Sequence, residues 1–200
     1  MTTRKVFNIK TMAKVAILSV IAFILMYFDF PIPFIAPGFY KIDFSEVAVL
    51  IGGFALGPLA AILIEGLKIM LYMLFKPSST AYVGELANFI IGCALVVPAS
   101  AIYFKNKNRK NAFIGLLVGA ISMITVGLLM NYFVLIPAYS FFFNLDLDTI
   151  IQMGKAIVPF INNKLTFVTF ATTPFNIVKV VAVAGLTMIL YKHISPLLKK

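Results

Sequence analysis

The sequence predicts an all-α integral membrane protein with six transmembrane helices. Of its 200 residues, 62% are hydrophobic and 12% are charged, whereas charged residues make up about 25% of a soluble domain. The apolar residues gather in runs long enough to cross a bilayer, which takes about 20 residues in a helix. The basic residues lie between these runs, mostly on one side. We therefore expect residues 1–200 to form a single domain, a transmembrane helix bundle surrounded by lipid.

The helices are predicted from the apolar runs in chain order. The first run lacks a small-residue cleavage site and five more follow it, so we expect a retained helix and not a signal peptide. The second run is short, and Gly57-Pro58 separates it from the third, because proline cannot donate to the preceding helix and favours a helix start. One long helix kinked at this point is the alternative. The predicted spans are 12–30, 44–56, 58–75, 82–104, 112–139 and 166–191.

The basic residues orient this bundle. With six spans, eleven of them fall on the side of the two termini: Arg4, Lys5, Lys10, Lys14, Lys105, Lys107, Arg109, Lys110, Lys192, Lys199 and Lys200. Four fall on the other side: Lys41, Lys76, Lys155 and Lys164. The positive-inside rule then places both termini in the cytoplasm of a bacterial-type cell. The net charge of +10 reflects topology and anionic lipid, and we expect no nucleic-acid partner.

Two outer segments are unusual. The first, DFPIPFIAPGFYKID at 29–43, has three prolines and is aromatic, whereas a solvated connector would be polar. We expect its residues 30–43 to fold back over the bundle as a lid; an aromatic anchor at the membrane interface is the alternative. The second segment, 140–164, contains Asp146 and Asp148, which predict the start of a short amphipathic helix at the interface.

Lys179 is the most informative single residue. It lies inside the apolar run 165–190, with Asn176 three residues earlier on the same helical face and Thr172 one turn further back. A charged side chain at membrane depth is costly and marks a candidate functional site. These side chains therefore predict a site for a polar solute. Glu85 is the expected partner that neutralises Lys179 across the bundle.

Other polar residues also lie within the spans. Glu65 and Lys68 are three residues apart, which favours an intrahelical ion pair with Tyr72 one turn on. Glu85 and Asn88 have the same spacing beside Gly84, near the outer end of the fourth span.

For Glu85 binding is favoured over a structural role, whereas for Asn88 binding and helix packing are both open. Asn131, in the fifth span, favours binding, with an interhelical hydrogen bond as its alternative.

The sequence carries no motif of enzyme chemistry. It has no G-x-x-x-x-G-K-[ST] segment that would cradle ATP phosphates and no G-x-S-x-G turn. Its only histidine, His193, lies at the cytoplasmic end, and its only cysteine, Cys93, lies in an apolar helix. We expect no catalytic residue, no metal site and no cofactor.

Four stretches of the chain are similar to the riboflavin-specific S components of energy-coupling-factor (ECF) vitamin transporters: FPIPFIAPGFYKIDFSEVAVLIGGFALGP, LIEGLKIMLY, GELANFIIG and TPFNIVKV. The resemblance covers nearly the whole chain. It implies an S-component bundle that captures riboflavin outside the cell with high affinity. Riboflavin would be delivered inward with a transmembrane coupling subunit and two ATPase subunits, which alone would use ATP.

The resemblance also suggests roles for the polar residues. The flat ring of riboflavin has donors and acceptors along one edge, which suit the Asn176 amide and the Lys179 ammonium. The remaining expected contacts are Glu85, Asn88 or Asn131 to the ribityl hydroxyls, Phe39 and Tyr40 over the ring, and Lys41 and Asp43 at the mouth, where both could instead be solvated rim charges.

The partner surface is less well defined. In the family, small residues on the first span pack on the coupling subunit. Here Ala13, Ala16 and Val20 form an imperfect version of that stripe.

Two other functions remain open from the residues alone. One is a standalone secondary carrier for a small polar or aromatic solute, driven by an ion gradient and using Glu65, Glu85 and Lys179 as coupling groups. The other, a small membrane enzyme with a buried carboxylate, is less favoured because the chain shows no catalytic motif.

Overall fold

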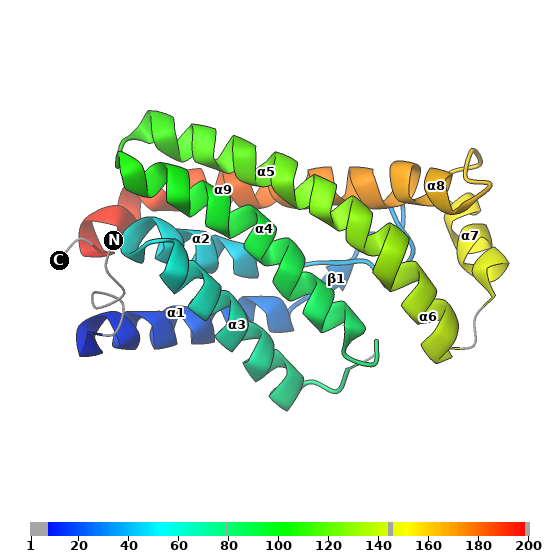
Figure 1. Cartoon of the computed structure of the whole chain (residues 1–200), viewed down its shortest axis with the longest axis horizontal. Coiled ribbons are helices and arrows are strands. Elements are labelled where there is room, and N and C mark those ends of the chain that lie inside the picture. Colours follow the sequence, from blue (N-terminus) through cyan, green and yellow to red (C-terminus); the bar gives the residue numbers. More distant parts are fainter. Residues whose placement is uncertain (1–7, 79, 144–145, 199–200) are drawn as a thin grey trace.

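The computed structural model describes residues 8–78, 80–143 and 146–198. These residues form a helix bundle (Figure 1). Its α-helices are α1 Ile9–Tyr27, α2 Ser45–Leu56, α3 Pro58–Phe75, α4 Val83–Lys105, α5 Arg109–Met130, α6 Ile136–Phe143, α7 Leu147–Lys155, α8 Lys164–Phe167 and α9 Thr173–Leu198. Two π-helical segments, η2 Asn131–Leu135 and η3 Val168–Thr172, join α5 to α6 and α8 to α9, and β1 Phe30–Pro31 pairs antiparallel with β2 Lys41–Ile42.

Within the described residues, five helical segments are long and apolar enough to cross a membrane: Ile9–Tyr27, Pro58–Phe75, Val83–Lys105, Arg109–Phe142 and Lys164–Tyr191. They match five of the predicted spans to within a few residues. The sixth, α2, is different because it has only 12 residues and contacts α1, α3, α4 and α9. Most of α2 is buried, so it fills the centre of the bundle, where lipid does not reach.

The junction of α2 and α3 is a turn. Gly57 has φ 104° and ψ 172°, a conformation that residues with a side chain rarely adopt, and its N–H donates to the Gly53 carbonyl at 2.9 Å. Pro58 then begins α3, and α2 and α3 pack against each other. The alternative of one kinked helix is therefore excluded.

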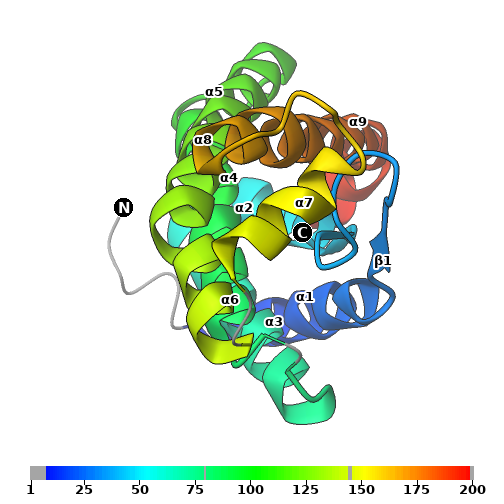
Figure 2. The ribbon, with the colours of Figure 1, turned by 90° about the vertical axis from the view of Figure 1, so that its right-hand side faces the viewer.

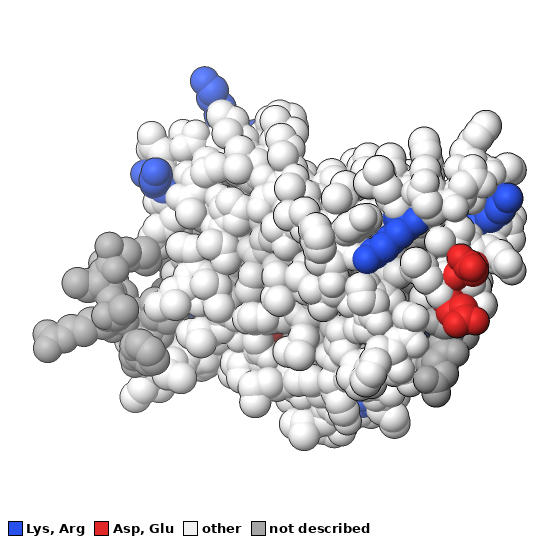
Figure 3. Space-filling view, turned by 45° about the vertical axis from the view of Figure 1, so that its right-hand side comes forward, with Lys and Arg blue, Asp and Glu red and all other residues white. Residues whose placement is uncertain are grey.

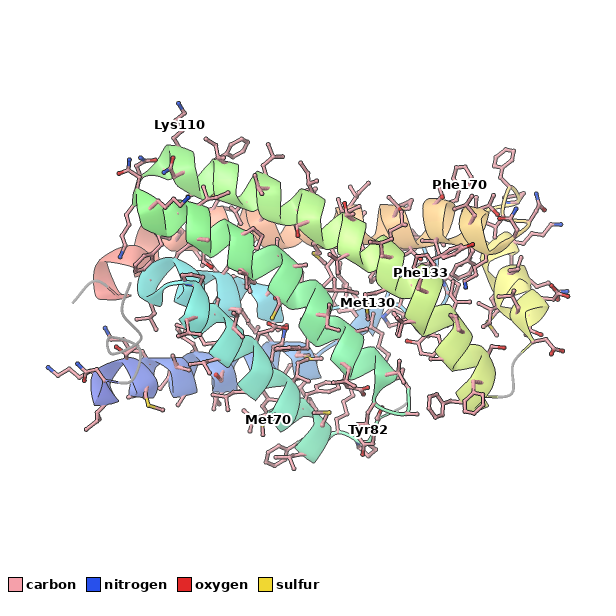
Figure 4. All side chains as sticks on the ribbon, viewed as in Figure 1. Met70, Tyr82, Lys110, Met130, Phe133 and Phe170 are labelled. Atoms are coloured by element: carbon pink, nitrogen blue, oxygen red, sulfur yellow. The ribbon has the colours of Figure 1, made fainter. Side chains whose placement is uncertain are left out.

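The outside of the bundle is apolar. Met70 and Phe170 are 56% and 45% exposed and point away from the helices (Figure 4). On the face shown in Figure 3, most Lys, Arg, Asp and Glu side chains lie toward the two ends, with a wide, largely uncharged belt between them. An exposed apolar belt between charged ends suits a protein that lipid surrounds.

The two ends of the bundle differ. The start of α1, the end of α9 and the α4–α5 connection lie together at one end (Figure 1). At the other end, α7 crosses the bundle and the loop that carries β1 lies beside it (Figure 2). Ala36 and Ile42 of this loop are buried against Phe175. The predicted fold-back of residues 30–43 and the short helix after Asp146 are both present.

Candidate functional site

A cavity of about 560 Å³ lies beneath the loop between β1 and β2. Its wall is built from this loop and from residues of α3, α4, α5, η2, α6, α7 and α9. Nine of the lining residues are those that the sequence singled out: Phe39, Tyr40, Lys41, Asp43, Glu85, Asn88, Asn131, Asn176 and Lys179. Side chains from four separate parts of the chain thus face one space, and its volume is within the range of roughly 300–1,000 Å³ found for ligand pockets.

Lys179 is paired with Asp43 and not with Glu85 as predicted. The Lys179 ammonium lies 3.1 Å from Asp43 Oδ2, and both residues are buried. The backbone N–H and the hydroxyl of Ser45 donate to Asp43 Oδ1. Burial alone would raise the pKa of the Asp43 carboxyl, but Lys179, Lys68 and the Ser45 hydrogen bonds lower it to about 2. The Asp43 carboxyl is therefore ionised at neutral pH, and Asp43 is no solvated rim charge.

Glu85 has a local partner instead. Its Oε2 accepts a hydrogen bond of 2.7 Å from the Thr80 hydroxyl. Ala81 and Tyr82, with φ of 49° and 64°, turn the chain just before α4 and bring Thr80 back over the first turn of the helix. The cavity wall therefore contains a carboxylate separate from the Lys179 ion pair.

The two asparagines of the wall differ in their hydrogen bonding. Asn131 is occupied, because its Nδ2 donates to the Gly127 carbonyl at 2.8 Å and its Oδ1 accepts from the Tyr40 hydroxyl at 2.5 Å. Asn176 is 5% exposed, and its Nδ2 has no hydrogen-bond partner. A buried amide donor without an acceptor costs about 1–3 kcal/mol. Asn176 therefore lines the cavity with its amide donor unsatisfied.

Tyr40 connects the loop to two helices. Its hydroxyl also shares a hydrogen bond of 2.7 Å with Thr172 Oγ1. Asn131 begins η2 and Thr172 ends η3, so the tyrosine bonds both π-helical segments, a type of helix irregularity often found at functional sites. Burial raises the pKa of the Tyr40 hydroxyl well above its usual value, which keeps the group neutral at physiological pH.

A network of ion pairs and hydrogen bonds around Asp29 forms part of the cavity wall. Lys76 lies 2.7 Å from the Asp29 carboxylate and Lys41 lies 3.7 Å from it. The Tyr72 hydroxyl donates to the same carboxylate at 2.9 Å, so Tyr72 does not join the Glu65–Lys68 pair as expected. Asp29, Tyr72, Thr80 and Tyr139 also line the cavity. The sequence analysis assigned none of these four to the site, because their proximity to Lys41 and Glu85 arises only in the folded chain.

A second charged cluster lies between α2 and α3. The predicted Glu65–Lys68 pair is present at 2.6 Å, and Glu46 of α2 adds a second carboxylate 2.8 Å from the same ammonium. The sequence missed Glu46, because an acidic residue in the first turn of a helix is also an ordinary feature of helix starts. None of these three residues lines the cavity.

Two further findings bear on ligands and partners. Ala13, Ala16 and Val20 are all on the exposed side of α1. Among the described residues, no group of three or more His, Cys, Asp or Glu side chains is arranged to hold a metal ion.

An apolar helix bundle with a cavity walled by buried ammonium, carboxylate and amide groups defines a membrane protein suited to bind a polar organic solute. A family model described as "ECF transporter, substrate-specific component" matches residues 10–191. The chain therefore belongs to the substrate-specific components of ECF transporters, and it is a multi-pass membrane component of a transporter, not an enzyme.

Two similar proteins and one solved structure support the same family. The riboflavin transporter RibU of Staphylococcus aureus is 33% identical over 96% of this chain and 93% of its own length. The riboflavin transporter FmnP of Bacillus subtilis is 30% identical over 94% of each chain. A solved structure of the S component of a bacterial ECF transporter is 33% identical, with a TM-score of 0.75 over 96% of this chain and 98% of the other.

Proposed function

We propose that this protein is the high-affinity riboflavin-binding subunit of an ECF-type vitamin importer in a bacterial cell membrane. It captures riboflavin from outside and passes it inward together with a transmembrane coupling subunit and two ATPase subunits. Relatives that are about one-third identical over nearly the whole chain are riboflavin transporters, which supports the substrate. The observation that carries the proposal is that Asn176, with a buried and unpartnered amide donor, lines the same cavity as Lys179.

Riboflavin suits the arrangement of the wall. Its ring carries carbonyl oxygens and ring nitrogens along one edge, and these acceptors match the Asn176 Nδ2 donor and a free N–H of Lys179. Phe39 of the loop, with Tyr139 stacked edge-on 5.5 Å from it, supplies aromatic surface for the ring faces. Glu85 and Asn88 on α4 are left to bond the ribityl hydroxyls. No arginine is among the described residues that line the cavity, which disfavours a phosphorylated flavin.

The same proposal includes the topology and the partner surface. Five helical segments cross the membrane, α2 lies among them as the sixth helix within the membrane, and both termini lie in the cytoplasm. The clustering of Lys10, Lys105, Arg109 and Lys110 near the end of the bundle where α1 starts and α4 meets α5 supports this orientation. The exposed Ala13, Ala16 and Val20 side of α1 is the contact for the coupling subunit.

Titration of riboflavin against purified variants tests the site. We expect Asn176→Ala to weaken binding roughly tenfold or more, because removing a hydrogen bond to a buried ligand group costs about 1–3 kcal/mol. Asn106→Ala, at the opposite end of the bundle, is the matched control and should bind as the parent does. Flavin absorption in the purified parent protein would support the substrate directly. Parent-like affinity in a folded Asn176→Ala protein would refute the proposed site.

A further inference from the structure

Glu46, Glu65 and Lys68, here called the Glu-Lys-Glu cluster, are the most deeply buried charged residues that the cavity does not use. Their exposed fractions are 1%, 0% and 0%. The Lys68 ammonium lies 2.8 Å from Glu46 Oε1 and 2.6 Å from Glu65 Oε1. Gly92 of α4 makes room for both carboxylates, since a Cβ at this position would lie 2.4 Å from Glu65 Oε1 and 3.0 Å from Glu46 Oε1.

The charges of this region do not balance if every carboxyl group is ionised. The neighbouring Asp43–Lys179 pair is neutral as a unit. The Glu-Lys-Glu cluster has two carboxylates against one ammonium, which leaves one negative charge inside the bundle. The thiol of Cys93 on α4 is the other titratable group within electrostatic range, and it supplies no positive charge. Glu85 of α4 is held by Thr80, and Tyr72 of α3 bonds Asp29.

The hydrogen bonds are also incomplete. An ammonium has three donors, and Lys68 donates to Ser45 Oγ at 3.1 Å and to Glu46 Oε1 at 2.8 Å. Glu46 Oε2 and both oxygens of Glu65 are buried without a hydrogen bond; Glu65 Oε1 touches the ammonium, but outside hydrogen-bond geometry. Two carboxylates that share one ammonium in a buried site cannot both ionise cheaply.

We propose that the Glu-Lys-Glu cluster binds one proton at neutral pH, which the carboxyl groups of Glu46 and Glu65 share. The proton cancels the excess charge and turns one carboxylate into an O–H donor for the other, so that both missing features are supplied together. A metal ion is disfavoured here, because the Lys68 ammonium already contacts both carboxylates and would repel a second cation.

This proton site is connected to the cavity wall. Lys68 donates to Ser45, Ser45 donates to Asp43, and Asp43 holds Lys179. Loss of the proton therefore draws the Lys68 ammonium toward two full negative charges and away from Ser45. The proton site does not depend on which solute the cavity takes, so it can be tested in the ligand-free protein.

Infrared spectroscopy of the full-length protein in lipid nanodiscs provides the test. We expect a carboxylic acid C=O band at pH 7, far above the pH of about 4.3 at which a solvated glutamate ionises, with a shift in D₂O. The band should disappear in Glu65→Gln and in Glu46→Gln, because each leaves one carboxylate for one ammonium. It should persist in Glu85→Gln, a matched change at another buried glutamate, and in Asp148→Asn on the surface.

Several results would overturn the proposal. One is a parent protein with no such band between pH 6 and pH 8. This measurement needs no variant, so it is informative even if the glutamine variants fail to fold. Another is a band that both glutamine variants retain. A third is a missing band together with a rise in unfolding temperature on replacing choline chloride by sodium chloride, which would assign the balancing charge to a metal cation.

Discussion

Lys179 has two roles in the structure that must be separated by experiment, since it lines the cavity and also neutralises the buried Asp43. We expect Lys179→Met to lower the free energy of unfolding by about 3–5 kcal/mol, the usual effect of leaving one charge of a buried pair alone. The same variant should lose riboflavin affinity. Thermal unfolding and flavin titration in detergent measure the two effects.

The double variant Asp43→Asn/Lys179→Met distinguishes the roles. Removing both charges should restore most of the stability, because replacing a buried ion pair by neutral groups is often tolerated. It should not restore riboflavin affinity if the ammonium binds the ring edge. Recovery of both properties would mean that Lys179 only keeps the site folded.

Gly92 is the residue on which the shape of the Glu-Lys-Glu cluster depends. We expect Gly92→Ala to destabilise the protein by about 1–3 kcal/mol, because the new methyl group would collide with the Glu65 carboxylate and force the cluster to shift. Gly66→Ala is the control within the neighbouring helix. Its Cβ would meet Phe89 at 3.6 Å, an ordinary contact, so this change should be neutral or stabilising by up to about 1 kcal/mol. Equal unfolding temperatures of the two variants would contradict the close packing around the cluster.

At the scale of elements, the loop between β1 and β2 is fixed to the bundle mainly through Tyr40. We expect Tyr40→Phe to leave the loop folded but less protected, because it removes hydrogen bonds to Asn131 in η2 and Thr172 in η3, each worth about 0.5–1.5 kcal/mol. Hydrogen exchange of residues 32–40 should become faster, and bound riboflavin should dissociate faster with little change in its association rate.

Tyr82→Phe provides the comparison for this prediction. Tyr82 is 51% exposed and does not line the cavity, so its hydroxyl should have no effect on exchange in the loop or on flavin dissociation. If Tyr40→Phe behaves like Tyr82→Phe, the loop is held by its apolar contacts through Ala36 and Ile42 and not by the tyrosine.

The helices and the local Glu65–Lys68 ion pair were predictable from the sequence, whereas the ion pairs between distant segments were not. Long apolar runs identify spanning helices because a segment in lipid must satisfy its backbone hydrogen bonds internally. Gly57-Pro58 marks a turn through local chemistry alone. Partner choice depends on distance in three dimensions. Asp43 reaches Lys179 from 136 residues away, and the turn that brings Thr80 to Glu85 uses two left-handed residues, Ala81 and Tyr82, that no sequence pattern marked.

At the scale of the whole molecule, the proposed function assigns capture and delivery of riboflavin to different surfaces: the cavity at one end of the bundle, and the exposed Ala13, Ala16 and Val20 side of α1 along its flank. We expect Ala16→Phe to block co-purification with a coupling subunit and its ATPases, because a large side chain prevents the close helix approach that small residues allow. Riboflavin binding to the isolated subunit should be unchanged.

The control for this assembly prediction is Ile21→Phe, which adds bulk to another exposed flank of the same helix. This variant should co-purify with its partners and support uptake as the parent does. If Ala16→Phe leaves assembly intact while Ile21→Phe abolishes it, the coupling subunit contacts the Ile21 flank of α1. Intact assembly in both variants would move the contact away from α1 altogether, and the division between a cavity end and a partner flank would then need a different helix.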